Sequence, residues 1–192
     1  MNIEIKTDNK DLLAHLEELK AKITPAAQVA VLNRTASKVS REAIKIASKS
    51  TGVPTKTLRK RINIPRQWKA RKGKLNVTIF GGTWPVKVSK LKPAPRQLKS
   101  GRVKYKTAPG TAVDPQAFIA TNTNGGTSVW KRKGKNRLPV KNITIDIAPG
   151  VKAALIAYGN GAEAKNFYEQ ALFKEMDRKI RGALVRRGVK VS

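Results

Sequence analysis

Apolar residues recur at helical spacing along residues 24–50 of this 192-residue chain. Thr24 and Pro25 predict a helix start, because threonine caps helices and proline is favoured at the first helical position. The apolar positions that follow define one face: Val29, Leu32, Ala36, Val39, Ala43 and Ile46. A row of basic residues lies about 200° around the helix axis from this apolar face: Arg34, Lys38, Arg41, Lys45 and Lys49. The pattern predicts a long helix with one buried face and one cationic face.

Further helices are predicted at both ends of the chain. A short strand at residues 3–7 precedes a helix over residues 8–23, which an aspartate caps. Pro149 opens another helical stretch, and the last helix spans residues 163 to about 187, where Gly188 ends it. The apolar face of this last helix is formed by Phe167, Tyr168, Ala171, Leu172, Met176, Ile180, Ala183 and Leu184.

Between the helices the apolar period changes to two, which is typical of strands. After a short basic helix within residues 55–62, a hairpin is predicted around residues 71–74. Its inward candidates are Ile62, Ile64, Val77 and Ile79. Further strands are predicted at residues 102–107, 117–121, 128–133 and 138–147. Proline-bearing residues 90–101 and 107–116 between them are interpreted as loops or arms.

This layout predicts an α+β fold: a central antiparallel sheet flanked by a long helix in the N-terminal half and by a C-terminal helix. We expect residues 1–23 to form an N-terminal strand and helix. Residues 24–192 are then a single α+β domain with basic loops or arms at about 85–117.

The charge is far from balanced. The chain has 41 Lys and Arg against 12 Asp and Glu, a net charge of +29. Residues 62–142 contain nineteen basic side chains, and Asp114 is their only acid. So much positive charge indicates a polyanion or an acidic protein as the partner.

Several classes of protein are disfavoured by the residues that are absent. The chain has no cysteine and one histidine, His15, which leaves no disulfide framework, no thiolate metal site and little support for a histidine base. The acids lie at helix surface spacing, which indicates solvated faces rather than a carboxylate pair in a cleft: Glu17, Glu18, Glu163, Glu169 and Glu175. No phosphate-loop motif is present, and no apolar run is long enough for a membrane span. We therefore expect no enzyme, no cofactor, no metal and no membrane contact.

The densest basic run is residues 128–142, and residues 69–74 are a second cluster. An isolated basic hairpin is most simply a soluble loop, but the two clusters and the cationic helix face add to one field. Lysine and arginine bind phosphates regardless of base sequence. We expect nine residues to face DNA or an acidic neighbour: Arg66, Lys69, Arg71, Lys72, Lys131, Arg132, Lys133, Lys135 and Arg137. The three tryptophans, at 68, 84 and 130, are expected to pack across strands, with a subunit interface as the alternative for a minority of them.

Four segments carry a resemblance to a known family. They are Leu-Asn-Arg-Thr-Ala at residues 32–36, the basic residues 53–62, Ala-Phe-Ile at residues 117–119, and residues 129–139. In this order they resemble the phage minor tail protein Z family, over about residues 19–187. Residues 1–18 and 92–113 look less like the family pattern.

The resemblance implies a structural subunit without catalysis, a tail completion protein at the head-proximal end of a long phage tail. It implies as partners the tail terminator, the neck proteins and further copies of the chain. Because long phage tails have sixfold symmetry, a hexameric ring around the DNA channel is the natural expectation. The protein would be assembled in the host cytoplasm and would reside in the virion tail.

Two other functions stay open on the sequence. One is a free, sequence-nonspecific nucleic-acid-binding module. The other is a protein-binding role, in which the positive charge meets an acidic partner protein.

Overall fold

The computed structural model describes the backbone of residues 10–108, 110–121 and 125–186, and their side chains except those of residues 10–23 and 184. The chain forms two compact units. Unit 1 comprises Met1–Ala36, Arg66–Thr78 and Ala162–Ser192, and unit 2 comprises Ser37–Pro65 and Ile79–Gly161. The strand predicted at residues 3–7 and the glycine stop at 188 lie outside the described residues. No described helix is both long and apolar enough to cross a membrane.

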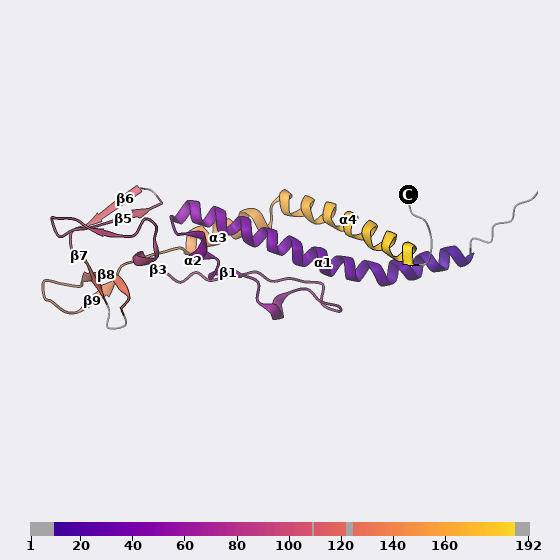
Figure 1. Cartoon of the computed structure of the whole chain (residues 1–192), viewed down its shortest axis with the longest axis horizontal. Helices are drawn as coiled ribbons and strands as arrows, with labels where there is room; N and C mark the ends of the chain where they lie inside the picture. Colours follow the sequence, from indigo (N-terminus) through magenta and orange to yellow (C-terminus); the bar gives the residue numbers. More distant parts are fainter. Residues whose placement is uncertain (1–9, 109, 122–124, 187–192) are drawn as a thin grey trace, which may run out of the picture. The chain divides into compact units, whose positions relative to one another are not determined.

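The first helix, α1, runs from Lys10 to Thr51 and contains Pro25 in its interior (Figure 1). The two helices that we predicted, with a restart at Thr24, are therefore one helix. A proline removes one backbone hydrogen bond and favours a kink, but it does not by itself end a helix. Gly52 ends α1 in the left-handed region, with φ of 71° and its N–H donated to the Ser48 carbonyl at 2.9 Å.

The buried face of α1 differs from the predicted one toward the end of the helix. Val39 and Ala43 are buried as expected, but Ile46 is 38% exposed, and Ile44 and Ala47 are buried in its place. The predicted row repeats about every 3.5 residues, whereas a straight helix repeats every 3.6. Such a row drifts by about 20° per heptad and leaves the core. The predicted basic row is mostly exposed.

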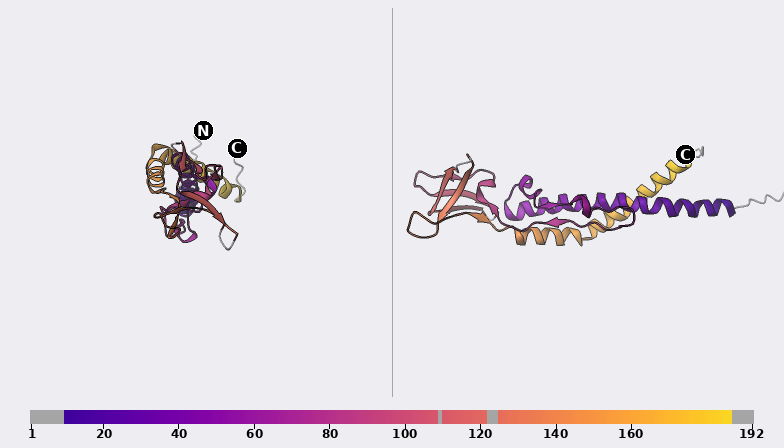
Figure 2. Two further views of the ribbon diagram at one scale, coloured as in Figure 1. Left: turned by 90° about the vertical axis from the view of Figure 1, so that its left-hand side faces the viewer. Right: turned by 90° about the horizontal axis from the view of Figure 1, so that it is seen from below.

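Unit 1 consists of the first part of α1, the loop of residues 66–78 and the helix α4, Ala162–Arg186. Figures 1 and 2 show α4 beside this part of α1 and running in the opposite direction. The buried residues of the unit are mostly small, and they include Ala27, Val31, Ala70, Ala164 and Ala171. Small side chains allow two helices to approach closely.

Unit 2 contains the described strands, and they form four small antiparallel sheets within the described part of the chain. The pairs and triplets are β1 (Ile62–Asn63) with β2 (Phe80–Gly81); β3 (Val86–Lys87) with β10 (Thr144–Ile145); β4 (Arg96–Gln97), β5 (Val103–Thr107) and β6 (Gly110–Asp114); β7 (Ala117–Thr121), β8 (Thr127–Arg132) and β9 (Val140–Asn142). The α+β class is confirmed, with the antiparallel strands divided among these sheets.

Three short helical elements complete the described part of unit 2: α2 (Thr55–Leu58), η2 (Val88–Lys90) and α3 (Ala148–Gly159). One apolar core joins the end of α1 to the strands and to α3. Its fully buried side chains include Val53, Leu58, Ile62, Val88, Val103, Ile147 and Val151. This core is the scaffold that carries the exposed basic segments of the unit.

Residues 107–116, which we predicted as a loop or arm, include strand β6. Its five residues pair in antiparallel register with β5, from Val103 opposite Asp114 to Thr107 opposite Gly110. The β-hairpin forms because Val103 is fully buried in the core, so β5 is fixed and provides an edge for β6. The predicted boundary between residues 1–23 and residues 24–192 stays a prediction.

Candidate functional site

The loop of residues 66–78 in unit 1 holds the first group of predicted contact residues. The 3-10 helix η1 (Arg66–Trp68) opens the loop, Arg71 and Lys74 pair as an isolated bridge, and the Thr78 N–H donates to the Trp68 carbonyl at 3.1 Å. Four cationic side chains on this loop are exposed: Arg66, Lys69, Arg71 and Lys72. The fold thus gathers them on one ordered loop.

Asn33 of α1 fixes this loop through two hydrogen bonds. Its side-chain Nδ2 donates to the carbonyl of Ala70, and the Ala70 N–H donates to its Oδ1, both at 3.0 Å. Ala70 is buried, so these bonds satisfy backbone groups that water does not reach. Sequence reasoning placed Asn33 in a family motif but gave it no role. The one signal for this role in the sequence was that Asn33 is an amide, with both a donor and an acceptor, within a predicted helix.

The β8–β9 hairpin of unit 2 holds the second group. The Lys133 N–H donates to the Pro139 carbonyl at 3.0 Å and closes the loop between the strands. The guanidinium carbon of Arg132 lies 5.9 Å from the centre of the Phe118 ring. Four side chains of the group are exposed: Arg132, Lys133, Lys135 and Arg137.

Lys131 differs from its neighbours because it already has an anionic partner. Its Nζ lies 3.0 Å from Oδ2 of Asp114, and the two side chains are 32% and 14% exposed. Lys131 also stands opposite Lys141 in the β8–β9 register, so Asp114 offsets a pair of like charges. Burial raises the pKa of the neighbouring Tyr105, and the charge of Asp114 raises it further. Lys131 therefore offers less charge to a ligand than the four exposed residues.

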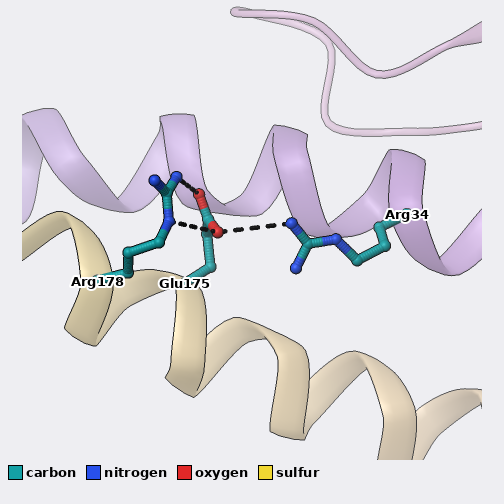
Figure 3. Close-up of polar contacts among 3 residues, drawn as sticks. All are labelled: Arg34, Glu175 and Arg178. Carbon is teal, nitrogen blue, oxygen red and sulfur yellow. Dashed lines mark hydrogen bonds and ion pairs between the residues drawn. The ribbon is translucent and has the colours of Figure 1, made fainter.

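Glu175 of α4 is buried, and Figure 3 shows the two arginines that contact its carboxylate. We predicted a solvated face for this residue, but its side chain is only 4% exposed. Arg178 donates from Nη2 and Nε to its two oxygens at 2.6 and 3.2 Å, and Nη2 of Arg34 lies 3.7 Å away. The hydrogen bonds from Arg178 lower the pKa of Glu175. Its helical spacing cannot distinguish it from the exposed Glu163 and Glu169 of the same helix.

Trp84 also departs from the prediction, because it is 48% exposed instead of packed across strands. The guanidinium carbon of Arg61 lies 4.2 Å from its ring centre, and the Phe80 ring centre lies 5.9 Å away. Burial lowers the pKa of Arg61. Trp68 and Trp130 are half-buried. Among the described residues, no three or more His, Cys, Asp or Glu side chains are grouped so that they could hold a metal ion.

The comparison with known families decides what these basic segments belong to. The model of the prophage minor tail protein Z family matches residues 9–189. The chain belongs to this family. The match includes residues 92–113 and most of residues 1–18, which looked less like the family on motifs alone. No curated protein and no solved structure is significantly similar to the chain.

Membership of the minor tail protein Z family makes the chain a structural protein of a phage tail. A structural protein acts through the surfaces by which it contacts its neighbours. In this minor tail protein, the loop of residues 66–78 and the β8–β9 hairpin are then candidate contact surfaces, one on each unit.

Proposed function

We propose that this minor tail protein completes the tail at its head-proximal end as the subunit of a hexameric ring. The tail terminator and the neck proteins are its neighbours there, and assembly takes place in the host cytoplasm. The cationic loops face the DNA channel and hold the phosphates of the genome without reading base sequence. Sixfold tail symmetry supports the stoichiometry, and the charge of the chain supports the contact with DNA.

The observation that carries the DNA contact is the exposure of the two basic loops on ordered backbone. Arg132, Lys133, Lys135 and Arg137 are exposed on a hairpin closed by a hydrogen bond between Lys133 and Pro139. The loop of residues 66–78 is anchored in the same way, by Asn33. Charges held on a fixed backbone lose less entropy on binding than charges on a flexible tail. Lys131 contributes less to DNA binding than the four exposed residues of the hairpin, because it already pairs with Asp114.

The test removes the charge of the hairpin and follows binding to a DNA duplex of arbitrary sequence at several salt concentrations. The variant replaces four residues: Arg132→Gln, Lys133→Gln, Lys135→Gln and Arg137→Gln. Each phosphate contact contributes about 0.9 to the slope of log K against log salt, so losing four contacts lowers the slope by about 3 to 4. Lys131 is kept, since it pairs with Asp114 in the fold.

The matched control removes four exposed lysines outside both loops: Lys49→Gln, Lys152→Gln, Lys165→Gln and Lys174→Gln. It has the same formal net charge as the hairpin variant, so a general electrostatic effect lowers the slope equally in both variants. An equal loss in both variants, or an unchanged slope in the hairpin variant, contradicts the proposed contact.

The ring is tested by the mass of the DNA-free protein at moderate salt, measured by analytical ultracentrifugation. We expect a hexamer. A chain that stays monomeric but binds duplex tightly is instead a free nucleic-acid-binding module. A chain that binds a purified tail terminator in a salt-sensitive way, without affinity for DNA, uses its charge on an acidic protein.

A further inference from the structure

A second surface of unit 2 combines positive charge with an apolar lining. It is a groove of about 1100 Å³ between the end of α2, the start of β3 and the residues after η2. Six cationic residues line it, and no acidic residue does: Lys56, Lys60, Arg61, Lys87, Lys90 and Lys92. Trp84, Leu91 and prolines form much of the remaining lining. A groove with apolar walls and a cationic rim fits an amphipathic acidic peptide better than a phosphate backbone, which offers no apolar side chains.

Trp84 is held in a fixed orientation within this groove. Arg61 lies over its ring at 4.2 Å, and Phe80 is tilted against it by 48°. Gly82 lies beneath the ring, and a Cβ at this position would come within 2.6 Å of Trp84 atoms. The ring is nevertheless 48% exposed. Exposed, preorganised tryptophans are common anchors of protein interfaces.

We propose that the groove binds the acidic N-terminal segment, residues 1–19, of a second copy of this chain. The inference rests on the proposed ring, because a ring needs a heterologous contact in which two different surfaces of one chain fit each other. The segment has five acidic and two basic side chains in a chain of net charge +29. It also carries four leucines, Leu12, Leu13, Leu16 and Leu19, which match the apolar lining.

The proposed contact also reduces electrostatic repulsion within the ring. Copies that each carry +29 repel one another unless opposite charges meet where they touch. Residues 62–142 contain a single acid, so they cannot provide this complement to the groove of a neighbour. The N-terminal segment provides it.

Two full-length variants test the contact by complementation. The groove variant carries Lys60→Glu, Lys87→Glu and Lys90→Glu, and the segment variant carries Asp8→Asn, Asp11→Asn, Glu17→Gln and Glu18→Gln. Each variant keeps one intact half of the contact. We expect each alone to sediment as a monomer and a one-to-one mixture to give heterodimers. The mixture cannot form a closed ring, because only one kind of contact is possible in it.

The control for the groove variant reverses three exposed lysines elsewhere, Lys152→Glu, Lys165→Glu and Lys174→Glu, with the same change in net charge. It should assemble like the wild type. Circular dichroism verifies that every variant is folded. Assembly of the groove variant like the wild type, or a mixture that stays monomeric, overturns the proposed contact.

The outcomes separate this contact from the proposed function. If the wild type forms a ring and the groove variant forms it as well, the proposed ring stands and only the groove is excluded as its interface. A wild-type chain that is monomeric at all concentrations overturns the ring and the groove contact together. If the groove variant assembles normally but loses affinity for duplex DNA, the groove is a DNA surface and the peptide contact is wrong.

Discussion

The side-chain amide of Asn33 makes two hydrogen bonds with the backbone of Ala70, one to its carbonyl and one from its N–H. A neighbouring β-strand would pair with the same two backbone groups. Ala70 lies between Lys69 and Arg71, at the centre of the basic loop in unit 1. One residue of α1 therefore anchors the loop of residues 66–78, which carries four exposed cations.

Replacing Asn33 with alanine should release this loop. The buried N–H and carbonyl of Ala70 then lose their partners, which costs about 1 to 3 kcal/mol. Hydrogen exchange should show a faster Ala70 amide in Asn33→Ala than in the wild type. Asn76→Ala, an exposed asparagine on the same loop, is the control and should leave that amide unchanged. Equal exchange rates in wild type and Asn33→Ala contradict the role of Asn33.

Two arginines of α4 make similar ion pairs in different surroundings, which gives a matched comparison. Arg178 binds the buried Glu175, whereas Arg181 pairs with Asp177, which is 62% exposed. Arg178→Met removes the main partner of a buried carboxylate and should lower the free energy of unfolding by more than Arg181→Met does. Arg181→Met should cost about 0.5 kcal/mol or less. Denaturant unfolding followed by circular dichroism measures the free energy of unfolding of both variants. Equal losses would show that the burial of Glu175 does not strengthen its ion pair.

Acid should remove the contribution of Glu175. Its pKa is lowered in the folded chain, mainly by the hydrogen bonds from Arg178, so folding is stabilised while the carboxylate is charged. This contribution is complete above the unfolded pKa of about 4.3 and is lost as the pH falls through the lower, folded value. The melting temperature of the wild type should therefore approach that of Glu175→Gln as the pH falls from 7 to about 3. A difference that stays constant over this range excludes the linkage.

Asp114 should stabilise the hairpin by offsetting the like charges of Lys131 and Lys141. Asp114→Asn keeps an acceptor for the Gln116 N–H but loses the charge, which should cost about 1 kcal/mol. Adding Lys141→Gln to this variant should restore part of the loss, because it removes the repulsion. Added salt should also help, since it screens exposed charges. If Lys141→Gln destabilises the wild type and the Asp114→Asn variant equally, the two lysines do not repel.

Local sequence patterns predicted most of the elements because each depends on neighbours in the chain. Helical periodicity predicted most of α1 and α4, and period-two alternation predicted β5, β7 and β8. The continuity of α1 through Pro25 was not predictable, because Thr-Pro can begin a new helix or can lie inside a continuous one. Strand β6 was missed because its pairing with β5, not its own composition, holds it.

The sequence by itself determined the α+β class, the family and the excess of positive charge, because these follow from residue types and their spacing. Only the tertiary structure decided which of these charged groups are paired. Glu175 and Lys131 read as exposed charges in the sequence, yet Glu175 is buried with Arg34 of α1 at 3.7 Å, and Lys131 pairs with Asp114 of another strand. Asn33 and Ala70, 37 residues apart, are joined in the same way. Burial and pairing depend on which distant segments fold against each other, and no local pattern records that choice.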